Sequence, residues 1–169
     1  MTADHAPSPR LPGATSSLHL RGERLLAAIP SSLPLLALRL ALAIPFFKSG
    51  LTKWDGLLTL SSGARYLFEE EFKLHILGHA FAYPMPLAMA AAAGTAELVL
   101  PVLLVLGLFT RYAALGLLAM TAIIQLTIPD GWANFHLPWA AMALALVVYG
   151  GGRIGLDTWL GSPSRAGEH

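Results

Sequence analysis

The sequence predicts an all-α fold: an integral membrane four-helix bundle with an amphipathic interfacial helix between the first two membrane helices. Two observations predict it. Of the 169 residues, 55% are hydrophobic and only 12% are charged, whereas an average soluble domain is about 25% charged. The apolar residues also gather in long segments. Too few charges remain to give such helices a solvated surface, so a bilayer must cover them.

The composition also excludes other classes of protein. The chain has no cysteine, which rules out a disulfide framework, a thiol redox centre and any Cys-ligated metal. Its net charge is +1, which argues against a nucleic-acid partner because such binders need a basic face. Apolar residues are too abundant for a disordered chain. Membrane lipids are the partners that the composition favours.

The membrane segments are expected where the apolar residues approach the length of about 20 that a spanning helix needs. They run over residues 33–54, 84–109, 112–128 and 135–152. The first segment carries Arg39 and Lys48, and the second carries Glu97. The third and fourth contain no Asp, Glu, Lys or Arg, and their most polar members are Gln125 and His136.

The connections predict how these helices follow one another. Residues 107–111 and 129–131 have the composition of tight turns, so we expect antiparallel neighbours on either side of each. The connection over residues 55–83 is longer. Between residues 64 and 77 its apolar residues recur near helical spacing, which predicts an amphipathic helix on the membrane surface or over the bundle. An ordinary solvated loop helix is the alternative. The recurring residues are Leu67, Phe68, Phe72 and Ile76.

The segments outside the membrane domain complete the organisation. Residues 33–160 form the transmembrane domain. Residues 1–32 are expected to be a cytoplasmic segment, disordered over residues 1–16 and with a short amphipathic helix before Pro30. Residues 161–169 are expected to be a loose tail. If the chain has four spans, Lys and Arg residues are more frequent on the side that holds both termini, so the positive-inside rule predicts cytoplasmic termini.

Ionisable residues inside a span are costly and are therefore candidates for function. A rise of 1.5 Å per residue places Lys48, Glu97, Gln125 and His136 at depths where we expect them to line one pocket in the outer half of the bundle. Arg39 is expected either to reach Glu97 from below or to extend to the cytoplasmic interface. These five residues are the candidate ligand-binding set. The alternatives are an ion pair that fixes helix register, and a proton path.

Pro101 follows Glu97 by one helical turn. A proline there has no N–H for the Glu97 carbonyl and its ring crowds that carbonyl, so we expect a kink at Glu97.

Earlier in the chain, Glu71, His75 and His79 are spaced by four residues, and on one continuous helix they would share a face that suits a metal. The alternative is a set of interfacial histidines.

Three signatures resemble the DoxX-like membrane proteins. The first is formed by Arg39, Phe47, Gly50, Lys53 and Trp54; the second runs from Glu97 through Pro101 to Gly107 and Arg111; the third runs from Gly152 and Arg153 to Asp157. The second signature is the most specific. The long connection, with its acidic residues 69–71, is similar to a branch encoded beside genes for metal-responsive modified peptides and their maturation enzymes.

The resemblance implies a four-helix protein of the bacterial inner membrane with cytoplasmic termini. Some relatives are membrane subunits of thiosulfate:quinone oxidoreductases, and others accompany redox or detoxification systems. No catalytic residue is carried over. The first hypothesis is an accessory protein of a redox, metal-stress or peptide-maturation system, with a protein partner and a quinone or lipid-like ligand, which is not an enzyme on its own. The alternatives are a small transporter or export helper, and a structural scaffold.

Overall fold

The computed structural model describes residues 14–56 and 58–161, and the chain divides into two units. The first unit contains α1 (Ala14–Ala27). This confirms the helix predicted before Pro30, and it shows that residues 14–16 are helical where disorder was predicted. The predictions of disorder for residues 1–13 and of a loose tail for residues 162–169 lie outside the described residues.

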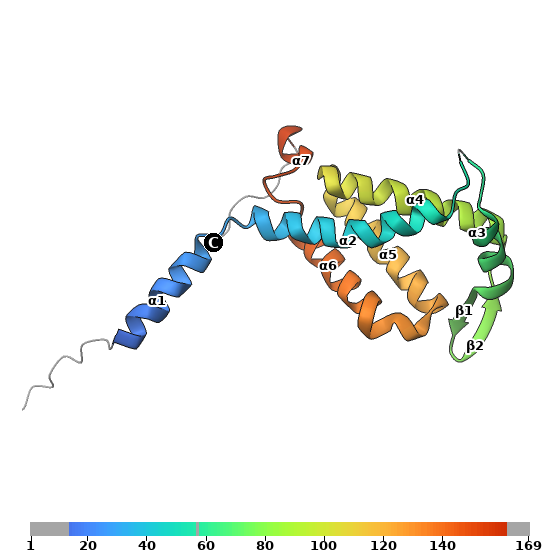
Figure 1. Ribbon diagram of the computed structural model, residues 1–169, viewed down its shortest axis with the longest axis horizontal. Helices are drawn as coiled ribbons and strands as arrows, with labels where there is room; N and C mark the ends of the chain where they lie inside the picture. The colour runs from blue at the N-terminus through green and yellow to red at the C-terminus, as the bar shows by residue number, and fades with distance from the viewer. Residues whose placement is uncertain (1–13, 57, 162–169) are drawn as a thin grey trace, which may run out of the picture. The chain divides into compact units, whose positions relative to one another are not determined.

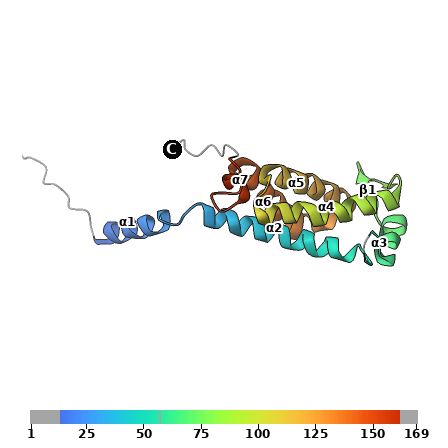
Figure 2. The ribbon, with the colours of Figure 1, turned by 90° about the horizontal axis from the view of Figure 1, so that it is seen from above.

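The second unit begins at Ser31 and is built from four long helices that pack side by side (Figures 1 and 2). They are α2 (Ser32–Thr52), α4 (Pro86–Leu106), α5 (Thr110–Thr127) and α6 (Leu137–Tyr149). A turn of 3₁₀-helix, η2 (Pro129–Gly131), and a turn of π-helix, η3 (Trp132–His136), lead into α6. Among the described residues, three helical stretches are long and apolar enough to cross a membrane: residues 32–52, 86–106 and 129–149.

The core of this unit consists mainly of aliphatic and aromatic side chains from the four long helices, with a few buried polar residues among them. In α2 the buried residues Arg39 and Phe46 lie two helical turns apart, and Gly50 follows Phe46 by one turn. In α4 the buried residues Gly94 and Glu97 lie about one turn apart. These spacings place each set on one helix face. The opposite faces are also apolar, which a bilayer favours and water does not. The outward residues include Ile44, Val102, Leu115 and Leu144.

The long connection differs from the prediction. It contains a short helix, α3 (Ser62–Tyr66), a π-helical turn, η1 (Leu67–Glu71), and a hairpin of β1 (Lys73–Ile76) and β2 (His79–Ala82). The helix predicted over residues 64–77 is therefore wrong beyond Glu71, and the fold is mostly helical rather than all-α.

The hairpin has a local physical cause. Phe72 adopts an extended conformation that ends the helix. Leu77 and Gly78 both have positive φ, 51° and 82°, which is the conformation that a two-residue hairpin turn requires. The apolar residues up to Phe72 do follow a helix, but Ile76 belongs to β1 and its helical spacing is coincidental. A last short helix, α7 (Leu156–Trp159), follows α6.

Candidate functional site

The site begins where α2 and α4 approach each other most closely. A Cβ added to Gly50 would lie 2.9 Å from Leu98 Cδ2 and 3.0 Å from the backbone carbon of Glu97. A Cβ added to Gly94 would lie 2.8 Å from Trp54 Nε1 and 3.1 Å from Lys53 Cβ. Small residues allow such contact between membrane helices. The two glycines therefore hold the end of α2 directly against Glu97.

We expect Gly50→Ala to destabilise the protein. The added methyl group would collide with the backbone of α4 as well as with Leu98, and overpacking of this kind costs about 1–3 kcal/mol. Thermal unfolding in detergent measures the change. Gly63→Ala is the matched control, because a Cβ at Gly63 meets no atom within 4 Å. Equal stability of the two variants would contradict this account of the α2–α4 contact.

Lys53 and Glu97 form an ion pair at this contact. The distance from Lys53 Nζ to Glu97 Oε2 is 2.5 Å, and their side chains are only 13% and 5% exposed. Lys53 Nζ also donates a hydrogen bond to Ser49 Oγ at 3.1 Å. Pairing of a charged lysine with a charged carboxylate satisfies both groups where little water reaches them. The partner of Glu97 is thus Lys53, which the sequence analysis did not place in the site.

His136 provides a second polar group. It is buried, and its Nδ1 lies 2.6 Å from Gln125 Oε1. The Gln125 Nε2 group donates to the Pro129 carbonyl at 3.1 Å, so the amide oxygen is the atom that faces the histidine. An amide oxygen only accepts hydrogen bonds, so His136 Nδ1 is the donor in this pair. In the neutral ring, Nε2 is then an acceptor.

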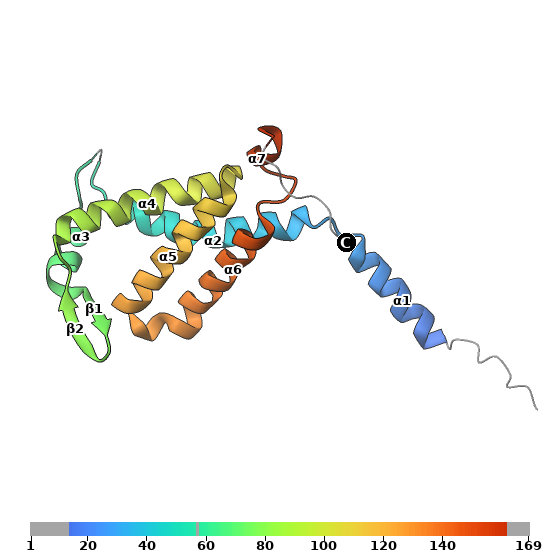
Figure 3. The same ribbon diagram turned by 180° about the vertical axis from the view of Figure 1, so that it is seen from behind.

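These groups lie on the wall of one cavity of about 760 Å³. The wall includes Lys53, Glu97 and His136, while Gln125 lies behind His136. In Figures 1 and 3 the pair α5–α6 diverges from the pair α2–α4 toward the hairpin, and the cavity is lined by residues from all four helices and from the connection. Most of its wall is apolar. Its aromatic residues are Phe68, Phe72, Tyr83, Phe135 and Trp139.

Three residues of the connection, Phe68, Phe72 and Tyr83, cover one side of the cavity. Phe68 packs against Tyr83 with their ring centroids 5.6 Å apart. The Tyr83 hydroxyl lies 2.6 Å from Thr127 Oγ1, which ties the end of the hairpin to α5. On the opposite wall the Trp139 ring lies 5.0 Å from Phe46 and 5.6 Å from His136. The arrangement suits a planar, largely apolar molecule with polar substituents, because aromatic walls stack on rings and the three polar groups supply donors and acceptors.

Lys48 and Arg39 do not join this cavity. The prediction that Lys48 lies beside Glu97 is wrong, because Lys48 is exposed on the outer face of α2. The prediction used only the depth along the helix axis, whereas the direction of a side chain around that axis is set by the helical repeat. Arg39, Phe46 and Lys53 are spaced by seven residues and share the buried face, and this spacing is the signal by which Lys53 could have been found.

Arg39 does not contact Glu97, which was one of the two positions expected for its side chain. Its side chain is 1% exposed and donates hydrogen bonds to four backbone carbonyls. The acceptors are Leu104 at 2.6 Å, Val105 at 2.5 Å, Gly151 at 3.1 Å and Ile154. Two of these carbonyls end α4 and two follow α6. Arg39 therefore joins the last turn of α4 to the segment after α6, at the end of the helices away from the cavity.

Four other residues of the predicted signatures gather at this same end: Gly107, Arg111, Arg153 and Asp157. Gly107 ends α4 with a φ of 67°, and a Cβ there would lie 2.7 Å from the Arg39 side chain. Asp157 accepts hydrogen bonds from the backbone N–H groups of Phe109 at 2.7 Å and Thr110 at 2.9 Å. Arg111 donates to the Val147 carbonyl at 2.9 Å. The Arg153 backbone N–H donates to Ser32 Oγ at 3.1 Å.

We expect Asp157→Ala to destabilise the protein by about 1–2 kcal/mol, because α5 would lose the carboxylate that satisfies its first N–H groups. The shift in thermal unfolding in detergent measures this. Asp55→Ala removes an exposed carboxylate for which the described residues show no side-chain partner, and it is the control. If both variants unfold like the unchanged protein, Asp157 does not act as a cap.

Two further predictions concern Pro101 and the metal site. Pro101 is buried within α4, which continues through it as one helix from Pro86 to Leu106.

The helical face predicted for a metal does not exist: Glu71 ends η1, His75 lies on β1 and His79 lies on β2. Within residues 14–56 and 58–161, no three His, Asp or Glu side chains come together as a metal site would need.

Two comparisons with known proteins show what the chain is similar to. An uncharacterized protein of Haemophilus influenzae is 32% identical over 143 residues, which cover 77% of this chain and 85% of that protein. No solved structure matches. The family model of DoxX matches residues 34–130, the region that begins in α2 and ends after α5. This match covers more than half of the chain. The protein is therefore an integral membrane protein that belongs to the DoxX family.

Proposed function

We propose that the protein is an accessory subunit that binds a quinone-like ligand in the cavity beside Lys53, Glu97 and His136. One observation carries this proposal: an aromatic and otherwise apolar cavity places an ammonium group, a carboxylate and an imidazole on its wall. A quinone ring is planar and apolar, and its carbonyl oxygens accept hydrogen bonds. The ammonium of Lys53 is the donor for one carbonyl, and the aromatic rings pack against the ring face.

The Glu97 carboxylate and the neutral His136 ring can both accept hydrogen bonds from the reduced form of such a ligand. A quinol carries hydroxyl groups that donate hydrogen bonds, and both the Glu97 carboxylate and the neutral His136 ring accept them. The site therefore offers partners to the oxidised and to the reduced ligand. The chain lacks cysteine and therefore has no thiol redox centre. Electron transfer would therefore belong to a partner in a redox or peptide-maturation system.

The proposed setting is a bacterial inner membrane that four helices span. We take α5 as the fourth span because its 18 residues extend about 27 Å along the axis, close to the hydrocarbon thickness, and because it packs between α4 and α6. Arg111 and Arg153 lie at the Arg39 end of the helices. Together with Arg21 and Arg24 in the preceding segment, they favour a cytoplasmic location for that end.

Binding of a short-chain quinone analogue to the purified protein in detergent tests the proposal. Calorimetric titration should show saturable binding to the unchanged protein. Glu97→Gln should weaken binding of the reduced, quinol form of the analogue about tenfold, because the carboxylate that accepts a hydrogen bond from its hydroxyl group is lost and hydrogen bonds to charged groups contribute about 1.5–3 kcal/mol. Met89→Trp should abolish it by filling the cavity while the Lys53–Glu97 pair remains.

The matched control is Glu69→Gln, which neutralises an exposed carboxylate outside the cavity. It should bind the analogue as the unchanged protein does. Absence of saturable binding, or equal weakening by Glu97→Gln and Glu69→Gln, would overturn the proposal. Thermal unfolding of each variant in the same detergent confirms that the compared samples are folded.

A further inference from the structure

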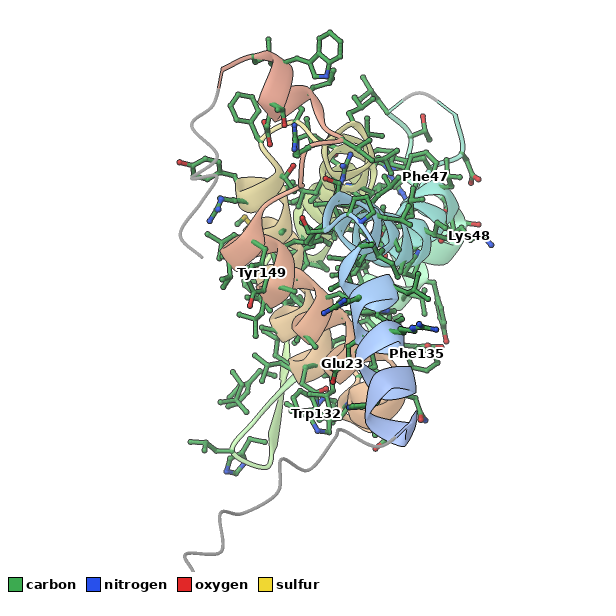
Figure 4. All side chains as sticks on the ribbon, turned by 90° about the vertical axis from the view of Figure 1, so that its left-hand side faces the viewer. Glu23, Phe47, Lys48, Trp132, Phe135 and Tyr149 are labelled. Carbon is green, nitrogen blue, oxygen red and sulfur yellow. The ribbon has the colours of Figure 1, made fainter. Side chains whose placement is uncertain are left out.

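Lys48 lines a second hollow, which is separate from the cavity and lies on the outer face of the helices. This groove of about 370 Å³ lies between α2 and α4. Apart from Lys48, all of its lining residues are apolar, and they include Ile44, Phe47, Val102 and Leu106. In Figure 4, Phe47 and Lys48 lie close together at the edge of the bundle. The groove therefore carries one charge on an otherwise apolar surface.

The contacts between α2 and α4 show how deep Lys48 lies. The two helices are antiparallel, because Arg39 binds carbonyls at the end of α4 whereas Gly50 lies against Glu97. Lys48 precedes Gly50 by two residues and is therefore level with residues 99–100 of α4. At a rise of about 1.5 Å per residue, that level is about 5 Å from the middle of α4. The charge of Lys48 thus lies within the hydrocarbon part of the bilayer.

The ammonium of Lys48 does not reach the headgroups from this depth. Half of the hydrocarbon thickness is about 15 Å, so the nearer headgroups are about 10 Å away, farther than a four-carbon stem extends. Side chains on a helix also lean toward its N-terminus, and on α2 that direction leads back along the groove to Ile44 and Phe47. Among the residues that the structure describes, the ammonium has no hydrogen-bond or ion-pair partner. An isolated charge at this depth is costly, and such residues normally pair.

We infer that the groove between α2 and α4 receives a membrane-spanning helix of a partner subunit, which places a carboxylate on Lys48 and apolar side chains against Phe47 and Val102. Charge complementarity at this depth selects the occupant. A carboxylate reaches the middle of the bilayer only when another helix carries it there, because the phosphate of a phospholipid stays at the headgroup level. The apolar lining, which continues to Val105 and Leu106 at the end of α4, suits the next turns of that helix.

A second copy of this chain does not supply the carboxylate. The four long helices contain one acidic residue, Glu97, whose side chain is 5% exposed and paired with Lys53. The partner is therefore a different protein. The inference rests on the proposed accessory role, for which it names the docking surface, but not on the proposed ligand, because the groove and the cavity share no residue.

Association with synthetic membrane-spanning peptides tests this surface. One peptide is a polyleucine helix with a glutamate at its centre, and the other has glutamine there. The full chain has no native cysteine, so Asp55→Cys takes a single dye, and energy transfer from each labelled peptide in phosphatidylcholine vesicles measures binding. The protein with native Lys48 should bind the glutamate peptide about tenfold more tightly, as expected for a hydrogen bond between charged groups.

Two variants separate the charge of the groove from its shape. Lys48→Met should remove the difference between the peptides and leave binding of the quinone analogue unchanged, so failure of this inference is distinguishable from failure of the proposed ligand site. Val102→Trp should weaken binding of both peptides by filling the groove while the charge remains.

Lys73→Met is the matched control, because it removes one lysine charge outside the groove, on β1. It should keep the tenfold preference. Equal binding of the two peptides, or a preference that survives Lys48→Met or that Lys73→Met removes equally, would overturn the inference. It would also be overturned if Lys48→Met abolished energy transfer between two differently labelled copies of the chain, since a second copy would then occupy the groove.

Discussion

Replacing Arg39 with methionine is expected to lower the free energy of unfolding by about 3–5 kcal/mol, the usual cost of breaking a buried charged interaction. The guanidinium of Arg39 donates to four backbone carbonyls from two segments that are far apart in the sequence. Methionine fills much of the same volume but leaves these acceptors without a donor, and each unsatisfied buried group costs about 1–3 kcal/mol. Thermal or SDS unfolding of the protein in detergent measures the loss.

Arg111→Met is the matched control for this experiment. Arg111 is exposed and donates one hydrogen bond, to the Val147 carbonyl, so its loss should cost less than about 1 kcal/mol. Arg39→Lys should remain destabilised, because an ammonium group is a point charge and cannot match the planar fork of donors. If Arg39→Met were as stable as Arg111→Met, Arg39 would not hold the end of α4 to the segment after α6.

The second large effect is expected at the ion pair beside the cavity. Lys53→Met leaves the Glu97 carboxylate buried without its cation, which should destabilise the protein by about 3–5 kcal/mol. The double variant Lys53→Met/Glu97→Gln removes both charges and should regain much of that stability. Unfolding measurements on both single variants and the double variant give the interaction energy directly. Additive effects would contradict a direct Lys53–Glu97 pair.

The positions of the membrane helices could be predicted from the sequence because they depend on local composition. The predicted segments 33–54 and 84–109 coincide with α2 (Ser32–Thr52) and α4 (Pro86–Leu106) to within three residues at each end. The buried position of Glu97 was also predictable, since a carboxylate in an apolar segment turns away from lipid. Its partner was not predicted, because depth along a helix was used without the direction around its axis, and that direction separates Lys48 from Lys53.

The contacts of Arg39, the hairpin and the cavity could not be predicted from the sequence, for a different physical reason. The partners of Arg39 are backbone carbonyls. Every residue has a backbone carbonyl, so the sequence does not indicate which ones Arg39 binds. The hairpin depends on positive φ at Leu77 as well as at Gly78, and leucine seldom adopts that conformation. The cavity depends on the divergence of two helix pairs and on the connection that covers it, which are properties of the packed chain rather than of any segment.

The cavity between the helices is the proposed binding site of a quinone-like ligand. Photolabelling tests this most directly. A photoreactive short-chain quinone analogue is illuminated with the protein, and the labelled peptides are identified by mass spectrometry. We predict labels on cavity-wall residues such as Phe72, Met89 and Trp139, which excess unlabelled quinone suppresses and Met89→Trp abolishes. Labels spread over the outward faces of the helices, unaffected by competitor, would contradict the account.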